Sequence, residues 1–289
     1  MTDYYKYFNF WSAEKFIKQA LNEDVGKGDI TSNLFIKSDS ISKAELLLKE
    51  NGIIAGLDIF KFVYKIIDEN IKIKSKIKEG KFLENRTILA TLDGNTRNLL
   101  KGERVALNIL QRMSGIATSV YDYKRRLNNN TIKIIDTRKT TPNFRLFEKL
   151  AVKIGDGDNH RFGLYDMILI KDNHIEANGG INNVLNKISK IRKRTELKVE
   201  IEVKTINQLN ALLDKGFGLI DIVMLDNFKI CDVKKAIRLN NKKFKLEISG
   251  GVNKDNIKKY HNIIGIDYIS VGSITHSVKS LDIALNFIT

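Results

Sequence analysis

The chain has 289 residues, enough for two domains with buried cores, and 43% of them are hydrophobic, an ordinary share for a globular protein. Its formal net charge is +15, and its single cysteine, Cys231, excludes an intrachain disulfide. No apolar run approaches the roughly 20 residues that span a bilayer, and the first residues lack a signal-peptide pattern, so we expect a cytoplasmic protein.

The positive charge has two interpretations. A polyanionic partner, either nucleic acid or phosphorylated small molecules, would need many basic residues on the protein. Alternatively, the charge is spread over a solvated surface in a chain rich in Lys, Ile and Asn. Stretches such as residues 72–81 and 192–194 favour this second interpretation. The placement of individual basic residues is therefore more informative than the net charge.

The first part of the chain predicts an α+β domain. Helical spacing is expected over residues 13–21, with Ser12 as the N-cap, over residues 97–117 and over residues 121–127. Strands are expected over residues 44–49, 72–77 and 87–92, with turns at residues 51–52, 79–80 and 93–94. We place the domain boundary near Ser114, which gives domains of residues 1–114 and 115–276, with residues 277–289 packing back on the first.

The second part contains six short apolar runs, and each ends in a polar residue or a glycine. The runs cover residues 133–135, 167–170, 198–201, 222–225, 244–248 and 268–271. Among the last four runs, the distance along the chain from the end of one run to the end of the next is about the length of one strand, one helix and two short loops. A parallel βα array brings the carboxyl ends of its strands to one edge, where active sites form. We therefore expect the polar endings to converge on one site.

The endings carry two kinds of charge. Arg138 and Arg161 suit carboxylates, because a guanidinium can donate two parallel hydrogen bonds to one. Glu202 and Asp226 are suited to sugar hydroxyls or to a divalent cation such as Mg²⁺, which prefers oxygen ligands. Such carboxylates would also stabilise positive charge developing on a sugar carbon.

Glycine-containing turns follow the last two expected strands, at Ser249-Gly250-Gly251 and at Gly272-Ser273. Glycines let backbone N–H groups approach a phosphate closely, and the last two loops of (βα) barrels commonly bind a phosphate in this way. The pair of turns therefore predicts a phosphate site.

Other interpretations of these residues stay open. Any one charged residue after a strand is equally typical of a solvated loop. Lys171, alone at the end of an apolar run, has the setting of a Schiff-base lysine. His160 and His174 lack metal-ligand partners at suitable spacing, so no metal–histidine site is expected. Asn143, after Thr141-Pro142, is expected in a turn with positive φ.

Three blocks resemble the signature of the quinolinate phosphoribosyltransferase family: Asp-Thr-Arg-Lys-Thr-Thr-Pro at residues 136–142, Asn-His-Arg at 159–161 and Lys-Asp-Asn-His at 171–174. Further blocks in the same order extend the likeness over nearly the whole chain. The resemblance implies a type II phosphoribosyltransferase that combines quinolinate with phosphoribosyl pyrophosphate (PRPP). The products would be nicotinate mononucleotide, CO₂ and pyrophosphate, in de novo NAD synthesis. The implied fold is an N-terminal α/β sandwich followed by an open, seven-stranded α/β barrel, of which the pattern accounts for six strands.

The resemblance also implies a role for individual residues. Quinolinate would be bound by Arg104, Arg138, His160, Arg161 and Lys171. PRPP would be bound by Lys139, Thr140, Glu202, Asp226, Ser249, Gly250, Gly251 and Gly272. The catalytic residues would be Lys139, Lys171, Glu202 and Asp226, with Mg²⁺ as cofactor, held by Glu202 and Asp226 through substrate or water. Arg104 would reach into the neighbouring subunit's site, which implies a homodimer.

The sequence departs from the family pattern in two loops. Asp156 and Asp158 stand where many relatives have a longer glycine run, and Asn143 replaces a common glycine. Three alternatives remain: a related branch with the same fold that is associated with molybdenum uptake, a Schiff-base aldolase acting through Lys171, and a nucleic-acid-binding protein. The intact Thr-Arg-Lys-Thr and Asn-His-Arg blocks favour the quinolinate enzyme, and no recognised nucleic-acid motif is present.

Overall fold

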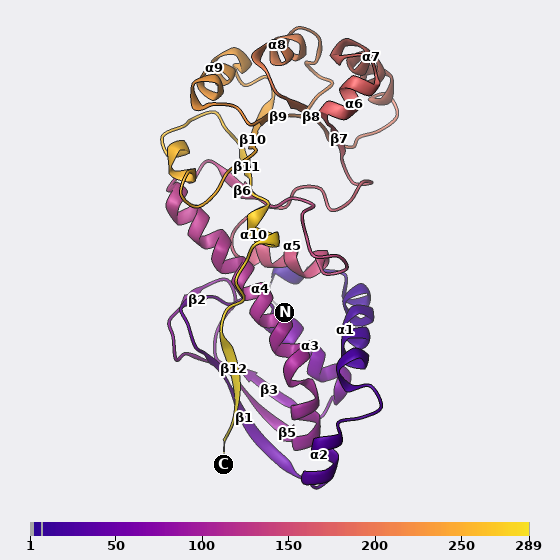
Figure 1. The fold of residues 1–289 in the computed structure, drawn as a ribbon, viewed down its shortest axis with the longest axis vertical. Coiled ribbons are helices and arrows are strands. Elements are labelled where there is room, and N and C mark those ends of the chain that lie inside the picture. The colour runs from indigo at the N-terminus through magenta and orange to yellow at the C-terminus, as the bar shows by residue number, and fades with distance from the viewer. Residues whose placement is uncertain (1–2, 7, 289) are drawn as a thin grey trace. The chain divides into compact units, whose positions relative to one another are not determined.

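The computed structural model describes residues 3–6 and 8–288 and forms two compact units (Figure 1). The first comprises Met1–Tyr121, Thr140–Asp156 and Ile274–Thr289, and the second comprises Asp122–Lys139 and Gly157–Ser273. The first unit extends to Tyr121, beyond the boundary expected near Ser114, and includes residues 140–156 besides the C-terminal segment that was expected to return to it.

The first unit is built on an antiparallel sheet with the strand order β12-β1-β5-β3. The strands are β1 (Ile41–Leu48), β3 (Lys72–Ser75), β5 (Ile88–Asn95) and β12 (Ile283–Ile288), and a separate pair is formed by β2 (Gly52–Ile53) and β4 (Phe82–Leu83). The turn expected at residues 93–94 is wrong, because β5 continues to pair with β1 as far as Asn95. The residues expected to pack back on the first domain include β12, which pairs with β1.

The helices of the first unit include η1 (Asp3–Tyr5), α1 (Phe10–Val25), α2 (Ile30–Phe35), α3 (Leu57–Ile67) and α5 (Arg145–Ile154). In α1 the buried residues Ala13, Ile17 and Leu21 recur every four positions, which places them on one face. The expected N-cap Ser12 is wrong, because the helix begins earlier and Asn9 Oδ1 accepts the hydrogen bond from Ser12 N at 3.0 Å.

One long helix, α4 (Thr96–Leu127), replaces the two helices expected over residues 97–117 and 121–127. Ser114 and Gly115 lie inside it rather than at a break. A Cβ added at Gly115 would collide with the Lys279 carbonyl oxygen, so the glycine permits a close approach of the chain near the C-terminal segment. Gly115, next to the expected boundary, is thus a packing residue.

The second unit contains a six-stranded parallel sheet with the order β6-β11-β10-β9-β8-β7. Its strands are β6 (Lys133–Ile135), β7 (Ile168–Ile170), β8 (Val199–Val203), β9 (Ile222–Asp226), β10 (Lys245–Ser249) and β11 (Tyr268–Ser270), within two residues of the six expected runs. The connecting elements are α6 (Asp172–Ala177), α7 (Ile181–Ile191), α8 (Ile206–Lys215), α9 (Ile230–Asn240) and η2 (Ile257–Tyr260), and α10 (Ser273–His276) follows β11. Figure 1 shows α7, α8 and α9 on the same side of the strands.

A trace of the expected seventh strand lies at the free edge of β6. Asp158 N donates to the Ile134 carbonyl at 2.8 Å, and Asp136 N donates to the Asp158 carbonyl at 3.2 Å. This parallel bridge involves a single residue and is not long enough to form a strand. Among the described residues, no helix is both long and apolar enough to cross a membrane.

Candidate active site

Three of the expected acidic and hydroxyl residues lie at the carboxyl ends of neighbouring strands. Glu202 lies in β8, Asp226 ends β9 and Ser249 ends β10. The register pairs Glu202 with Met224, and Asp226 with Ser249. Because the strands are parallel, these side chains stand along one edge of the sheet, as the strand endings predicted.

The two carboxylates interact with each other and with a lysine. Burial, and then the negative charge of Asp226, raise the pKa of Glu202 above its ordinary value, while Lys171 acts in the opposite direction. The Lys171 Nζ atom, on a half-exposed side chain that follows β7, lies 4.0 Å from Glu202 Oε2. This edge therefore pairs two adjacent acids with the accessible cation of Lys171.

Two arginines lie close enough together to repel each other. Burial, and then the neighbouring guanidinium of Arg138, lower the pKa of Arg161. Arg161 Nη1 donates to the Met167 carbonyl at 3.3 Å, whereas its buried Nε has no hydrogen-bond partner among the described residues. A buried donor without a partner, beside a like charge, is an arrangement that an anionic ligand would complete.

The loops that carry these cations are tied together by Asp136, which is fully buried at the end of β6. Its Oδ1 accepts a hydrogen bond from His160 N at 2.9 Å. Within the following loop, Lys139 N donates to Thr137 Oγ1 at 3.0 Å, and the side chains of Arg138 and Lys139 are exposed.

A constrained turn follows β10. Gly250 and Gly251 have φ angles of +93° and +60°, which favour glycine. The Asn227 main-chain N–H donates to the Ser249 carbonyl at 2.9 Å, and a Cβ on Gly250 would collide with the Asn227 side chain. Gly272 follows β11, the neighbour of β10.

Two expected site residues, Arg104 and Thr140, belong to the first unit. The Arg104 side chain is 69% exposed and lies 3.4 Å from Glu103. Thr140 Oγ1 accepts a hydrogen bond from Arg145 Nε at 2.8 Å. Asn143 has a φ of +62°, which confirms the positive-φ turn expected there.

Sequence reasoning missed two buried acids beneath the strand ends, Glu200 of β8 and Glu247 of β10, which are both 0% exposed. His160 Nε2 lies 2.9 Å from Glu200 Oε2 and 3.8 Å from Glu247 Oε2. Alternation was the signal that could have found them, because Glu200 precedes Glu202, and Glu247 precedes Ser249, by two residues. In a strand such residues share a face.

Two sets of residues have the chemistry to bind a metal. Glu202 and Asp226 offer the oxygen ligands that Mg²⁺ prefers. The ligand atoms of His160, Glu200 and Glu247 lie within 4.8 Å of one another, an arrangement that the spacing of the histidines did not predict. In this second set Arg161 N donates to the His160 Nδ1 at 2.8 Å, and Nε2 is the ring nitrogen that faces the two carboxylates.

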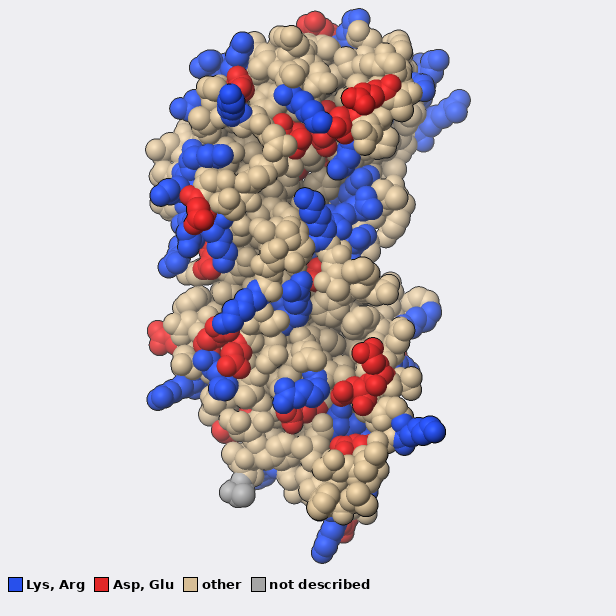
Figure 2. All heavy atoms as spheres, viewed as in Figure 1, with Lys and Arg blue, Asp and Glu red and all other residues tan. Residues whose placement is uncertain are grey.

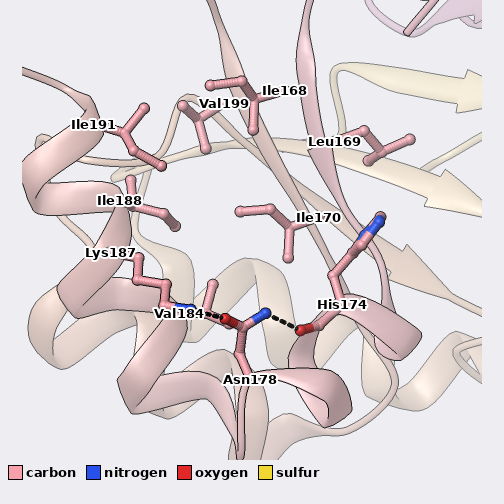
Figure 3. Close-up of a pocket in the computed structure, with 10 residues that line it drawn as sticks. All are labelled: Ile168, Leu169, Ile170, His174, Asn178, Val184, Lys187, Ile188, Ile191 and Val199. Atoms are coloured by element: carbon pink, nitrogen blue, oxygen red, sulfur yellow. Dashed lines mark hydrogen bonds between the residues drawn. The ribbon is translucent and has the colours of Figure 1, made fainter. Parts of the chain in front are cut away.

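A separate apolar cavity of about 260 Å³ lies between β7, α6, α7 and β8 (Figure 3). Aliphatic side chains of these elements, among them Ile170, Val184 and Ile188, line most of it. At its rim Asn178 Nδ2 donates to the His174 carbonyl at 2.6 Å. Its lining lacks the gathered charges of the strand ends and does not suit a multiply charged ligand.

Comparison with known proteins gives the family. Residues 29–114 match the model of the quinolinate phosphoribosyl transferase N-terminal domain, and residues 116–286 match that of its C-terminal domain. A protein of Bacillus subtilis named "Probable nicotinate-nucleotide pyrophosphorylase [carboxylating]" is 40% identical over 278 residues, which cover 96% of this chain and 94% of the relative. The mitochondrial "Quinolinate phosphoribosyltransferase [decarboxylating] 2b" of Nicotiana tabacum is 37% identical, with 96% and 83% covered.

Solved structures agree. NadC from Streptococcus pyogenes superposes with a TM-score of 0.92 at 36% identity, and the nicotinate-nucleotide pyrophosphorylase from Francisella tularensis with a TM-score of 0.91 at 35% identity. Both comparisons cover 100% of each chain. The chain therefore belongs to the quinolinate phosphoribosyltransferase family.

Proposed function

We propose that this chain is a quinolinate phosphoribosyltransferase, the decarboxylating nicotinate-nucleotide pyrophosphorylase of NAD biosynthesis. It joins quinolinate to PRPP and releases nicotinate mononucleotide, CO₂ and pyrophosphate. The observation that carries the proposal is the pairing, in one unit, of two neighbouring guanidinium groups with two adjacent carboxylates at the strand ends. The first pair suits a dicarboxylate and the second suits a ribose.

Quinolinate is bound through its two carboxylates. Arg138 and Arg161 supply charge-assisted hydrogen bonds, with the unpartnered Arg161 Nε as one donor. Lys171, half-exposed and 4.0 Å from Glu202, stands between the dicarboxylate and the sugar. His160, which precedes Arg161 in the chain, also binds a quinolinate carboxylate.

PRPP is bound by its hydroxyls and its phosphates. Glu202 and Asp226 accept the ribose hydroxyls, and the turns at Ser249-Gly250-Gly251 and at Gly272 hold the 5′-phosphate. Lys139 and Thr140 contact the pyrophosphate. Mg²⁺, held near Glu202 and Asp226 through substrate or water, would neutralise charge on the pyrophosphate, and the oxygen ligands there fit such an ion.

The chemistry needs no covalent nucleophile. As the bond to pyrophosphate breaks, the sugar carbon gains positive charge, which Glu202 and Asp226 stabilise electrostatically. The pyridine nitrogen of quinolinate then bonds to that carbon. The resulting pyridinium accepts the electron pair released when the adjacent carboxylate leaves as CO₂. The protein mainly positions two anions and offsets their repulsion.

The active assembly is a homodimer in the cytoplasm, where a reducing environment suits the exposed thiol of Cys231. Arg104 extends from one subunit into the partner's site. Its side chain is exposed and makes an ionic contact with its helix neighbour Glu103, so it is available for such a role.

The other hypotheses have less support. A Schiff-base lysine is usually desolvated, whereas the Lys171 side chain is 51% exposed. Figure 2 shows basic and acidic side chains intermingled over the face in view, which favours a dispersed charge over a nucleic-acid surface. No observation of the structure favours the molybdenum-uptake branch.

The test is turnover by the purified chain with quinolinate, PRPP and Mg²⁺. We expect CO₂, pyrophosphate and nicotinate mononucleotide in equal amounts. Lys171→Ala should abolish turnover, while Lys198→Ala, an exposed lysine that precedes β8 at the opposite edge of the sheet, should not. Activity with nicotinic acid in place of quinolinate, or no turnover with either, would contradict the proposal.

A further inference from the structure

The helix α5 holds the loop that precedes it through two side chains of its first turn. Arg145, its first residue, donates from Nε to Thr140 Oγ1 at 2.8 Å, and the Thr140 hydroxyl keeps its own proton for donation to an anion. Glu148 accepts twice from Thr141, from the main-chain N–H at 3.1 Å and from the hydroxyl at 3.0 Å. Helix residues three positions apart are neighbours on the surface, so one face of α5 fixes two successive threonines.

Arg112 of α4 holds Glu148 and, with the same guanidinium, the chain that follows β11. It donates to Glu148 Oε1 from Nη2 at 2.9 Å and from Nε at 3.2 Å. Nη2 also donates to the Thr275 carbonyl, and Nη1 donates to the Val278 carbonyl at 3.2 Å. Because the donors of a guanidinium have fixed directions, Arg112 sets the loop before α5 against the segment after β11, both within the first unit.

These two segments adjoin the loops to which we assign the phosphates of PRPP. Lys139 and Thr140 directly precede Thr141, and Gly272 lies shortly before Thr275 in the chain. In PRPP the ribose ring fixes the separation of the pyrophosphate and the 5′-phosphate, so the two loops must be held at a matching separation. A misplacement of about 1 Å is enough to cost a large factor in rate.

The Arg112–Glu148 pair has the burial that such a role needs. Glu148 is 0% exposed with hydrogen bonds to both of its oxygens, and the Arg112 side chain is 23% exposed. A fully hydrogen-bonded network at a buried position is rigid. Thr141, in contrast, is exposed, so its contact with Glu148 is not needed to fill a core. The contact between Thr141 and Glu148 is the point at which the buried pair acts on the loop.

We infer that Arg112 and Glu148 are positioning residues for PRPP. The pair sets the loop that contains Thr140 and Thr141 against the segment that follows Gly272, and it does so without touching the substrate. The identity of the substrate rests on the proposed function, whereas the contact between Thr141 and Glu148 does not. The competing explanation is a buried ion pair that only stabilises the fold, and the experiments below distinguish the two.

The double variant Arg112→Met/Glu148→Met separates positioning from stability. It removes both charges and keeps apolar side chains of similar volume, so the chain should stay folded. We expect the KM for PRPP to rise roughly 10- to 100-fold. The KM for quinolinate should rise far less, because quinolinate also depends on Arg161 and Lys171, which belong to the second unit. Equal increases in both KM values, or an unchanged KM for PRPP in the folded variant, would overturn the inference.

The matched control is Arg192→Met/Asp221→Met, at the amino ends of β8 and β9. Arg192 likewise pairs with an acid and donates to a main-chain carbonyl, that of Leu197, at 2.6 Å. Asp221 likewise accepts from a main-chain N–H, that of Val199, at 2.7 Å. Both KM values should stay at the wild-type level. A rise in the KM for PRPP equal to that of the first double variant would show that loss of any ion pair suffices, and would contradict positioning.

Variants of Thr141 test the inference without disturbing the buried pair. Thr141→Val keeps the shape and removes the hydroxyl donor, whereas Thr141→Ser retains it. Because Thr141 is exposed, both variants should be nearly as stable as the wild type. We expect Thr141→Val to raise the KM for PRPP roughly 2- to 10-fold, the worth of one ordinary hydrogen bond, and Thr141→Ser to show the wild-type value. The same KM in both variants would contradict the role of this contact.

Amide hydrogen exchange measures the contact in the absence of substrate. The Thr141 N–H, which donates to buried Glu148, should exchange slowly in the wild type and at least roughly tenfold faster in Arg112→Met/Glu148→Met. Equal exchange rates would overturn the inference. If the wild-type amide is protected but quinolinate and PRPP are not turned over, the proposed function fails and the contact stands. Turnover with the same KM for PRPP in every variant would leave the function intact and refute the positioning role.

Discussion

At the scale of single residues, burial has changed the acid–base behaviour of several carboxyls. Glu79 of the first unit is one of them, at 8% exposed. Its Oε1 accepts hydrogen bonds from Tyr5 OH, at 3.1 Å, and from Leu57 N at the start of α3. Burial raises its pKa from 4.5 to about 7 despite those two donors. The carboxyl thus joins the N-terminal segment to α3 and keeps its proton below a pH of about 7.

This shift predicts a pH dependence of stability. Between pH 4.5 and pH 7 the folded chain holds a proton on Glu79 that the unfolded chain has released, so the contribution of Glu79 to the free energy of unfolding falls as the pH rises through this window. Glu79→Gln does not titrate. From pH 4 to pH 8 the wild type should lose about 3 kcal/mol relative to the variant, measured by urea denaturation. A constant difference between the two proteins would contradict the assignment.

The turn after β10 gives a second prediction for a single residue. In Gly250→Ala the new methyl group would strain a φ of +93° and collide with Asn227, which should displace the turn and raise the KM for PRPP at least roughly tenfold. Gly218→Ala is the matched control, because Gly218 also has a positive φ but open space around its Cα. Both variants should lose about 1–2 kcal/mol of stability to backbone strain. An unchanged KM for PRPP in Gly250→Ala would argue against phosphate binding there.

The sequence predicts the positions of polar residues well where each follows a clear apolar run. Glu202, Asp226 and Ser249 follow apolar runs, and β8, β9 and β10 place them at one edge. Glu200 and Glu247 escaped prediction because a carboxyl inside a short buried strand contradicts the usual rule that charges face water. The histidine that lies beside them, His160, comes from a distant loop.

At the scale of elements, a buried ion pair joins three segments of the first unit. Arg112 of α4 donates to Glu148 of α5 from Nη2 at 2.9 Å and from Nε at 3.2 Å. Arg112 also donates to the carbonyls of Thr275 and Val278 near the C-terminal segment. Glu148, 0% exposed, accepts a hydrogen bond from Thr141 N at 3.1 Å.

Removing one member of this pair should be costly. Arg112→Met leaves a buried carboxylate without its cation, and we expect a loss of about 3–5 kcal/mol in the free energy of unfolding. The double variant Arg112→Met/Glu148→Met should recover most of that loss, because it removes the stranded charge. The urea midpoints of the single and double variants provide the measurement, and equal midpoints would show that the pair contributes through packing alone.

Elements were harder to predict where burial obscures the helical period. The helix α5 was not predicted, and it buries both apolar residues and the charged Glu148 and Lys149, so no clean polar face marks it. The opposite error affected α4, where a break was expected between residues 117 and 121 but the helix is continuous. Thr118 fits inside the helix because its hydroxyl donates to the Ser114 carbonyl at 2.7 Å.

At the scale of the whole molecule, the proposed dimer makes a distinctive prediction. Arg104→Ala and Lys171→Ala should each abolish activity while leaving the subunits folded. An equal mixture that exchanges subunits should regain about one quarter of wild-type activity, because half of the dimers are mixed and each mixed dimer has one intact site. Arg125→Ala, an exposed arginine on the same helix, is the control and should remain active. A mixture that stays inactive would show that sites are not shared.

The division of the chain into units also exceeded what sequence could predict. Residues 140–156 and 274–289 belong to the first unit, although each adjoins the segments of the second. Periodicity describes neighbours along the chain, whereas this arrangement depends on contacts between residues far apart in sequence. Prediction therefore succeeded for the strands of the second unit and for the return of the C-terminal segment, whereas the return of residues 140–156 was not predicted.

The pairing of β1 with β12 has a consequence for synthesis of the protein. Leu48 pairs with Ile283, so a central strand of the first sheet leaves the ribosome long before its neighbour exists. Until then one edge of β1 offers unpaired N–H and C=O groups to any nascent chain nearby. We expect the growing polypeptide to depend on a chaperone during this interval, and premature termination before residue 283 to yield an aggregating product rather than a functional fragment.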